Sequence, residues 1–254
     1  MNKPLLQPVS PSAPDLADFS LRSKFSAIDA WVFDLDNTLY PPDSDLWPKI
    51  DERITLFLMT RFGLDGQSAR ALQKYYYQRH GTTLRGLIDE DLVDPAQFLA
   101  FVHDIDRSSL AANPALAKEV AALPGRKFIF TNGSRDHALR TAARLGLEGA
   151  FEDVFDIVAG NMVPKPAAAA YRAFFDRYGV DPTHAAMFED IAKNLLVPRA
   201  LGMTTTLVVA RADQVDFREA HDREIEDALA IDFTTSDLAG FLSEVNAELR
   251  GAAA

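Results

Sequence analysis

Short apolar segments that end in polar residues recur along the chain, and this alternation is the feature that most constrains its fold. The first is Ala-Trp-Val-Phe at residues 30–33, which runs directly into Asp34, Asp36 and Thr38. Similar segments lie at residues 127–130, 156–159, 185–188 and 205–209, and a last one lies near residues 230–233. Continuous apolar strands separated by helices are typical of a parallel sheet covered on both faces. We therefore expect an α/β fold with a doubly wound parallel sheet.

The intervals between these segments carry apolar residues at helical spacing. Helices are expected at residues 113–123, 138–145 and 171–178, and from Ser236 onward. Gly146 and Gly179 follow two of them, in the position that favours a left-handed cap. Pro198 lies inside a further candidate at residues 194–201, so that helix is expected to be kinked or short.

One long interval, about residues 43–110, carries no strand signal. Leu46, Ile50, Ile54 and Leu58 recur there at four-residue spacing, and further helical stripes follow. Because an insert of this size is too long for a simple crossover, we expect a small helical cap over the strand ends. The expected organisation is a flexible, proline-interrupted tail at residues 1–26, a discontinuous core at residues 27–42 and 111–254, and the cap between its two parts. The charged stretch 214–227 is expected to be a solvated loop or helix.

The composition excludes several classes of function. The 254 residues include 37 acidic and 26 basic side chains, a net charge of −11, which argues against nucleic acid polymers and anionic membrane surfaces as partners. There is no cysteine, and no apolar run reaches the roughly 18 residues that span a bilayer. Disulfides, thiolate metal sites and cysteine nucleophiles are therefore excluded. A cytoplasmic protein is expected.

Polar side chains follow several of the expected strands. Asp34 and Asp36 alternate in extended chain, so both carboxylates point the same way and can hold Mg²⁺ or divide into nucleophile and acid/base. Thr131 and Asn132 follow the second strand, where a hydroxyl, an amide and free N–H groups can bind an anion. Each motif alone also fits a plain turn or a helix cap.

Two further motifs complete the set. Lys165 precedes Pro166, which is expected at the first position of the helix at 171–178, and this lysine could neutralise a phosphoryl group. Glu189 and Asp190 end another strand and are possible ligands of a hard cation. An isolated lysine or acidic pair is more often a solvated surface group. All four motifs, however, fall at the carboxyl edge of the expected sheet, where open α/β sheets gather their ligand sites.

The ordered set of motifs resembles the haloacid dehalogenase-like hydrolase superfamily, which has Asp-x-Asp-x-Thr after a strand, then Thr or Ser, then Lys, then an acidic pair. The resemblance covers nearly all of the chain after about residue 27. It implies that Asp34 forms an aspartyl-phosphate and that Asp36 is the general acid/base, with its backbone carbonyl on Mg²⁺. By the same resemblance, Thr131, Asn132 and Lys165 would hold the phosphoryl group, and Asp190 would ligate the metal. Glu189 would be a ligand or support one.

The second aspartate favours phosphate chemistry. In this superfamily dehalogenases lack that residue and use no Mg²⁺, because a halide leaves without a proton. The resemblance therefore implies a Mg²⁺-dependent phosphomonoesterase that acts on a small phosphorylated metabolite. Asp36 must be protonated in the first step, so its pKa is expected to be raised, whereas Asp34 is expected to stay ionised.

The stretch from Tyr75 to Leu87 narrows the substrate, because its Tyr-Tyr, Gly, Thr and Arg-Gly-Leu residues resemble the pyrimidine 5′-nucleotidase branch. The resemblance implies a nucleoside 5′-monophosphate such as UMP or CMP. Tyr77, Thr82 and Arg85 are the candidates that would contact its base or ribose, although the tyrosines could also pack the cap. A phosphatase for a sugar phosphate or phosphoglycolate, and a non-catalytic ligand-binding protein, are the alternatives. The sequence leaves the oligomeric state open.

Overall fold

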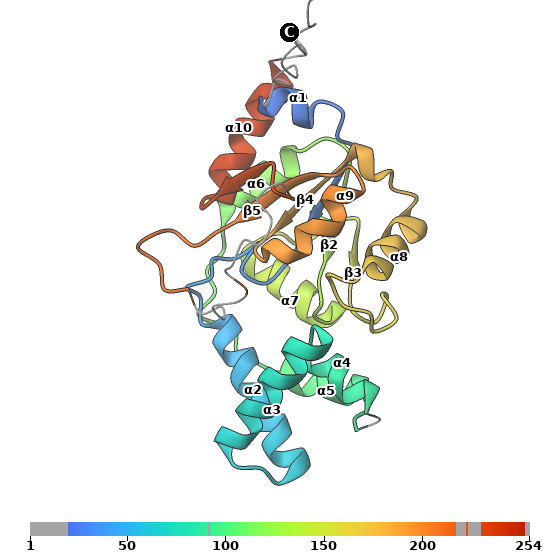
Figure 1. Ribbon diagram of the computed structural model, residues 1–254. Helices are drawn as coiled ribbons and strands as arrows, with labels where there is room; N and C mark the ends of the chain where they lie inside the picture. The colour runs from blue at the N-terminus through green and yellow to red at the C-terminus, as the bar shows by residue number, and fades with distance from the viewer. Residues whose placement is uncertain (1–19, 91, 217–221, 223–229, 252–254) are drawn as a thin grey trace, which may run out of the picture.

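The computed structural model describes residues 20–90, 92–216, 222 and 230–251, and within them six parallel strands form one sheet in the order β3-β2-β1-β4-β5-β6 (Figure 1). The register pairs Val32 of β1 with Phe128 of β2 on one side and with Met187 of β4 on the other. The strands are β1 (Ala30–Phe33), β2 (Arg126–Phe130), β3 (Asp153–Phe155), β4 (Ala185–Glu189), β5 (Thr204–Val208) and β6 (Phe233–Thr235). The expected doubly wound parallel sheet is confirmed.

Both faces of the sheet are buried under helices. Alternate residues of a strand point to opposite faces, so Trp31 and Phe33 pack into one apolar cluster and Ala30 and Val32 into the other. The first face carries α1 (Leu21–Phe25), α6 (Pro114–Ala122), α7 (Arg135–Leu145) and α10 (Leu238–Arg250). The second carries α8 (Ala168–Tyr178) and the short pieces η1 (Pro182–His184), η2 (Ala192–Leu195) and α9 (Leu196–Ala200). The shortness of α9 agrees with the expectation from Pro198.

Four helices separate β1 from β2 along the chain: α2 (Leu46–Phe62), α3 (Gly66–His80), α4 (Thr83–Asp89) and α5 (Pro95–Val102). We call them the helical insert. They lie below the sheet in Figure 1 and share their own apolar cluster, centred on Phe57, Leu58, Tyr76 and Phe98. The insert adjoins the carboxyl ends of the strands, where the polar motifs are expected.

Several expected boundaries are wrong. The third strand is Asp153–Phe155 rather than 156–159, because the Asp156 carboxylate accepts hydrogen bonds from the N–H groups of Arg135 and Ala159 and so ends the strand in a turn. The last strand begins at Phe233, three residues later than expected, since Asp232 turns its carboxylate to Lys24 and Arg199.

The expected tail is also too long, and the helix after Lys165 begins later than expected. Residues 21–25 form α1, whose Phe25 side chain is buried and stacks on Trp31 at 5.6 Å between ring centroids. Pro166 does not open α8, which begins at Ala168 after the N-cap Ala167. Most of the stretch 214–227, expected to be a solvated loop or helix, lies outside the described residues.

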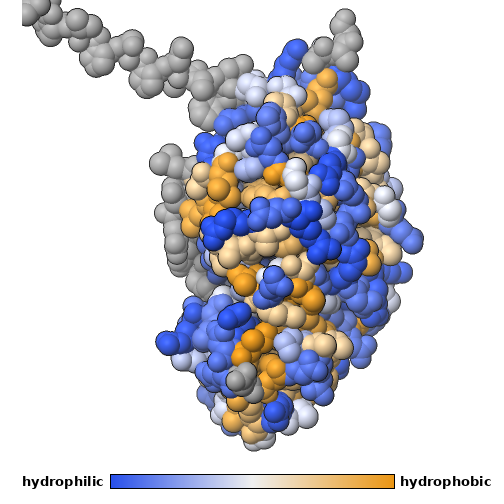
Figure 2. Space-filling model, turned by 90° about the vertical axis from the view of Figure 1, so that its right-hand side faces the viewer, coloured by the Kyte–Doolittle hydropathy of each residue, from blue (hydrophilic) through white to orange (hydrophobic). Residues whose placement is uncertain are grey.

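Hydrophilic residues cover most of the face in Figure 2, and hydrophobic residues form separate groups among them. The large exposed apolar side chains come from different elements, for example Leu56 in α2, Tyr75 in α3 and Leu139 in α7. In the described part of the chain, none of the helices combines the length and the apolar character that a bilayer span requires.

Gly125 gives a test of how β2 is anchored to the strand beside it. Its φ is +76°, and a Cβ built there would lie 2.2 Å from the carbonyl oxygen of Asp29. We expect Gly125→Ala to lower the free energy of unfolding by about 3 kcal/mol or more, through left-handed strain plus the clash with backbone. Chemical denaturation measures the change.

The matched control is Gly149→Ala. Gly149 has nearly the same φ, +73°, and no described atom lies within 4 Å of its built Cβ. This variant should cost only the backbone strain, about 1 kcal/mol. Equal losses in the two variants would contradict the predicted clash.

Candidate active site

The carboxyl ends of β1, β2 and β4 bring the polar motifs together. Asp34 follows β1 directly, Thr131 follows β2, Glu189 ends β4 and Asp190 follows it. The strand order reverses at β1, which lies between β2 and β4, and such a switch point opens a crevice at this edge. The N–H of Asp34 donates to the carbonyl of Phe188 at 2.9 Å, which ties the first motif to β4.

The Lys165 ammonium lies at the centre of this edge. Its Nζ donates to Asp34 Oδ1 at 2.6 Å, to Glu189 Oε1 at 2.8 Å and to the Phe130 carbonyl at 2.8 Å. All three charged side chains are buried. The lysine therefore has three acceptors: Asp34 directly after β1, Phe130 in β2 and Glu189 in β4.

Burial raises the pKa of Asp34 to about 7: loss of hydration and repulsion from Glu189 and Asp36 outweigh the attraction of Lys165. This differs from the expectation that Asp34 stays ionised. Burial alone would lower the pKa of Lys165, but the carboxylates of Asp34 and Glu189 raise it above its ordinary value. At this end of the site one ammonium therefore faces two carboxyl groups, and the negative charge is not fully compensated.

Three buried carboxylates fit a hard divalent cation. Ligand oxygens of Asp34, Glu189 and Asp190 all lie within 4.8 Å of one another, and oxygen donors of this kind suit Mg²⁺. The Glu189 oxygens already accept from Lys165 and Asn194 on Oε1 and from the Ile191 N–H on Oε2. This favours Glu189 as a support for neighbouring groups over a direct ligand.

Asn194, which the motif reading missed, adds a further polar atom to this edge. It lies in η2, and its Nδ2 donates to Glu189 Oε1 at 2.6 Å. Among the described residues its buried Oδ1 accepts no hydrogen bond. An orphaned acceptor beside the acid cluster fits a site whose remaining partner is a water on a metal. Only its place five residues after Glu189 could have marked it in the sequence.

Thr131 and Asn132 behave differently from each other. Thr131 Oγ1 accepts from the Gly133 N–H at 2.9 Å and lines the cavity around Asp34. The Asn132 amide accepts from the Lys165 N–H at 2.8 Å and donates to the Lys165 carbonyl at 3.2 Å. Asn132 thus holds the backbone of Lys165 through two hydrogen bonds, and this pair of bonds supports the position of the ammonium.

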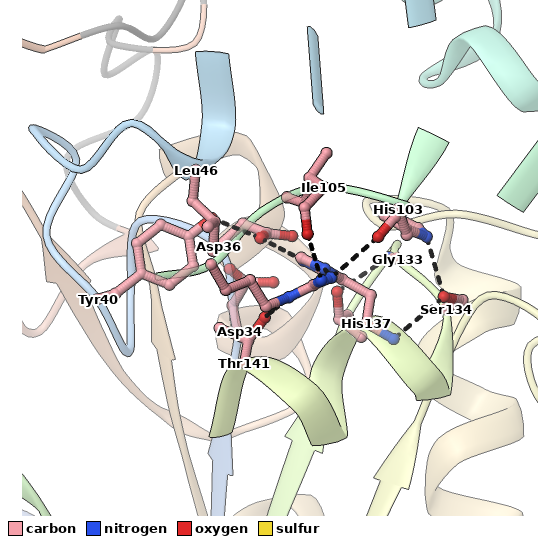
Figure 3. A network of polar contacts seen from close by, with 12 residues as sticks. Asp34, Asp36, Tyr40, Leu46, His103, Ile105, Gly133, Ser134, His137 and Thr141 are labelled. Atoms are coloured by element: carbon pink, nitrogen blue, oxygen red, sulfur yellow. Dashed lines mark hydrogen bonds and ion pairs between the residues drawn. The ribbon is translucent and has the colours of Figure 1, made fainter. Parts of the chain in front are cut away.

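Asp36 accepts two hydrogen bonds on one oxygen. Tyr40 donates its hydroxyl to Oδ1 at 2.6 Å, and His137 Nε2 lies 2.9 Å from the same atom (Figure 3). Burial alone would raise the pKa of Asp36, but the interaction with His137 and both hydrogen bonds lower it below its ordinary value. The expectation of a raised pKa is therefore wrong, because these donors come from elsewhere in the chain.

Further polar residues surround His137. Arg107 Nη2 lies 2.8 Å from His137 Nδ1, and His103 stacks on the His137 ring with 4.4 Å between centroids. Ser134 contacts His103 Nδ1 at 2.9 Å (Figure 3). None of these residues belongs to the motifs that the sequence analysis singled out, because they meet only through the fold.

Two adjoining cavities open beside the carboxylates. One, of about 100 Å³, is lined by Asp34, Thr131, Lys165 and Asp190. The other, of about 150 Å³, lies between the core and the helical insert, and its wall is largely apolar; its apolar lining is Trp47, Ile50, Ile54, Leu84, Phe98, Leu99 and Val102. Asp36 lines both cavities and so lies where they meet.

The three substrate candidates in the insert differ in position. Tyr77 and Thr82 line both cavities. Tyr77 donates to Asp222 at 2.7 Å, and Lys193 lies over its ring at 4.9 Å, so this tyrosine bridges the insert and the core. Arg85 lines neither cavity: it pairs with Asp89 and donates to the Met162 carbonyl at 3.4 Å. The structure therefore does not place Arg85 against a substrate.

A family model described as a haloacid dehalogenase-like hydrolase matches residues 28–202, which is more than half of the chain. The chain belongs to this hydrolase family. The match spans the region from β1 to the end of α9, and so includes Asp34, Lys165, Glu189 and Asp190. As a haloacid dehalogenase-like hydrolase, the protein is expected to act on a small molecule.

Known proteins similar to this hydrolase include the yeast "Phosphate metabolism protein 8" from Saccharomyces cerevisiae, 27% identical over 134 residues. That alignment covers 49% of this chain and 42% of the yeast protein, less than half of either. It does not extend to the whole relative.

Solved structures show the same fold at low identity. The L-2-haloacid dehalogenase from Xanthobacter autotrophicus with chloropropionic acid covalently bound has a TM-score of 0.53 and 19% identity, and the match covers 86% of this chain and 98% of that one. The putative HAD-hydrolase YfnB from Bacillus subtilis, bound to magnesium, has a TM-score of 0.51 and 12% identity, with 87% and 98% covered.

The raised pKa of Asp34 predicts a pH-dependent effect of Asp34→Asn on the metal-free protein. In the folded state Asp34 keeps its proton up to about pH 7, whereas in the unfolded chain it loses the proton near pH 4. The stability that the neutral Asp34 carboxyl contributes is therefore fully present below about pH 4 and is lost as the pH rises to 7. We expect Asp34→Asn to change Tm little near pH 4 and to raise it, by an amount on the order of several degrees, at about pH 8. Calorimetric melts with EDTA measure this.

The control for these melts is Asp136→Asn, on the exposed surface of α7. It should show no such dependence. An Asp34→Asn effect that is the same at all pH values would contradict the burial argument.

Proposed function

We propose that this hydrolase is a Mg²⁺-dependent phosphomonoesterase that acts through Asp34 and releases the alcohol of a small phosphorylated metabolite. The observation that carries the proposal is the position of Asp36, a second carboxyl that adjoins Asp34 and lies where the two cavities meet. An alkoxide is a poor leaving group and needs a proton, whereas a halide needs none. A second acid at this place supports phosphate ester chemistry over dehalogenation.

The acid cluster supports the same choice. A phosphate monoester is an anion and must approach the Asp34 carboxylate, so the site needs compensating positive charge. Lys165 supplies one ammonium to Asp34, and three carboxylates gather within 4.8 Å. When bound there, a divalent cation would polarise the phosphoryl oxygens and offset the acidic charge. The magnesium bound in the structure of YfnB and the name of the yeast relative agree with this proposal.

In the proposed reaction the Asp34 carboxylate attacks phosphorus, and the bond from phosphorus to the ester oxygen breaks. Asp36 gives its proton to that oxygen, so the alcohol leaves neutral. Asp36 then takes a proton from water as the water oxygen attacks the aspartyl-phosphate, which releases phosphate and restores Asp34. Lys165 holds Asp34 in place, and the Thr131 hydroxyl can donate to a phosphoryl oxygen.

The substrate we propose is a nucleoside 5′-monophosphate, with a pyrimidine base. The phosphoryl group would lie in the cavity around Asp34 and Lys165, and the nucleoside in the larger cavity beyond Asp36. That cavity presents Trp47 and Phe98 among its apolar walls and Thr82 and Tyr77 near its junction with the first. Aromatic and apolar walls suit a planar base better than the second anionic group of phosphoglycolate.

The activity itself is tested by phosphate release from a panel of UMP, CMP, glucose 6-phosphate, phosphoglycolate and p-nitrophenyl phosphate, with Mg²⁺ or EDTA. Wild type should turn over UMP or CMP best and only with metal. Asp34→Asn should lower kcat about a thousandfold or more, since it removes the nucleophile. Asp136→Asn, exposed on α7, serves as the matched control.

Three outcomes would contradict parts of the proposal. Turnover that survives Asp34→Asn removes the aspartyl-phosphate route. Halide release from 2-chloropropionate without phosphate release favours dehalogenation. A preference for sugar phosphates over UMP removes the nucleotide assignment and leaves the phosphatase chemistry intact.

The nucleoside position is tested by filling the larger cavity. Ile54 lines that cavity from α2, so Ile54→Phe should raise KM for UMP about tenfold or more by steric exclusion. KM for acetyl phosphate, whose leaving group is small, should stay unchanged. Leu56→Phe is the matched control on the same helix, because Leu56 is exposed and outside the cavity lining. Equal KM values for UMP in both variants would place the nucleoside elsewhere.

A further inference from the structure

The Asp36 carboxyl is held asymmetrically. Both Tyr40 and His137 contact Oδ1, at 2.6 Å and 2.9 Å. Within the described part of the chain Oδ2 makes no hydrogen bond, and Asp36 lines both cavities. A carboxyl oxygen that already accepts two hydrogen bonds is a poor place for a proton, because the proton would take a lone pair that accepts one of them. The proton of the neutral acid therefore belongs on Oδ2.

This arrangement requires that His137 donate from Nε2, and the contact of Arg107 with Nδ1 determines which ring nitrogen carries the proton. A guanidinium has only donors, so the 2.8 Å contact between Arg107 Nη2 and His137 Nδ1 leaves Nδ1 without a proton. The proton of the neutral ring must then lie on Nε2, which faces Asp36 Oδ1. Arg107 therefore selects the tautomer of His137 that donates to Asp36.

Arg107 has little freedom to do otherwise. Nη2 also donates to the His103 carbonyl at 3.1 Å, and Nη1 donates to the Ile105 carbonyl at 3.1 Å. Nε donates to Thr141 at 3.3 Å, on the same helix as His137. The guanidinium is thus anchored between the chain after α5 and helix α7, and its orientation toward His137 follows from these bonds.

The His137 ring is also fixed in its plane. Its side chain is fully buried, and the His103 ring stacks on it with an angle of 11° between the planes. His103 in turn contacts Ser134, the N-cap of α7, through Nδ1 (Figure 3). A ring held by a guanidinium, a stacked ring and a helix has one orientation available, with Nε2 toward Asp36.

We propose that His137 is a positioning residue for proton transfer: its Nε2–H, selected by Arg107, holds Oδ1 of Asp36 so that the transferable proton stays on Oδ2. The inference rests on the phosphomonoesterase proposed above. During the first step the Oδ2 proton passes to the ester oxygen as its bond to phosphorus breaks, and Asp36 becomes a carboxylate. The donors on Oδ1 strengthen as that charge develops, which favours the transition state over the ground state.

The test compares two substrates of nearly the same shape, p-nitrophenyl phosphate and phenyl phosphate. The p-nitrophenolate leaves readily as an anion, whereas phenolate depends on a proton from Asp36. The measured quantity is kcat/KM, which reports the steps up to formation of the aspartyl-phosphate. His137→Phe keeps the stacked ring and removes the donor, so the ratio of kcat/KM for p-nitrophenyl to phenyl phosphate should rise about tenfold or more.

Two variants separate positioning from structure. His137→Gln places an amide N–H where Nε2 lies and should return the ratio close to the wild-type value. His184→Phe, at an exposed histidine before β4, is the matched control and should leave the ratio unchanged. Equal losses for both substrates in His137→Phe, or a glutamine variant that folds and does not restore the ratio, would overturn the proposal.

A measurement on the wild type covers the case in which His137→Phe fails to fold. In protein labelled with ¹⁵N-histidine, the His137 signals should show a protonated Nε2 and an unprotonated Nδ1. A protonated Nδ1 would overturn the role of Arg107 whatever the variants do. If wild type hydrolyses neither substrate with Mg²⁺, the proposed phosphomonoesterase function is wrong, while the tautomer of His137 can still be measured.

Discussion

One buried ammonium joins the three central strands at their carboxyl ends. Lys165 Nζ contacts Asp34 after β1, Phe130 in β2 and Glu189 in β4, all within 2.8 Å. A charge this deeply buried is tolerable only where its partners are fixed, because a lost partner leaves an uncompensated ion. The parallel sheet fixes them, and Asn132 clamps the loop that carries the lysine. The fold and the site are therefore constrained by the same interaction.

The sequence predicted where three of the four motifs lie because Asp34, Thr131 and the Glu189–Asp190 pair come at or directly after the ends of their strands. A parallel sheet brings all carboxyl ends to one edge, so Asp34, Thr131, Lys165 and Asp190 could be assigned to one place without knowing the strand order. The boundaries that were wrong depend on side chains that end a strand by hydrogen bonding elsewhere. Asp156 does so with Arg135 and Ala159, a contact that hydropathy does not report.

The surroundings of Asp36 could not be predicted in the same way. Its partner His137 is 101 residues away along the chain, and Arg107 reaches that histidine across another 30. Pairings of this kind follow from how α7 and the end of the insert meet, not from any local pattern. The expected pKa of Asp36 was reversed for that reason: chemistry called for a proton, and distant donors favour the carboxylate.

The two aspartates consequently have opposite surroundings only two residues apart. Burial and neighbouring acids favour the neutral form of Asp34, with one ammonium against them, while His137 and the Tyr40 hydroxyl stabilise the ionised form of Asp36. These directions are the reverse of what the proposed roles need, because a general acid should hold a proton and a nucleophile should not. For Asp34 to act as the nucleophile it must be ionised, and Lys165 alone does not achieve this at neutral pH. A divalent cation held by Asp34 and Asp190, beside Glu189, would supply the missing charge, so the proposed metal would serve the nucleophile as well as the substrate.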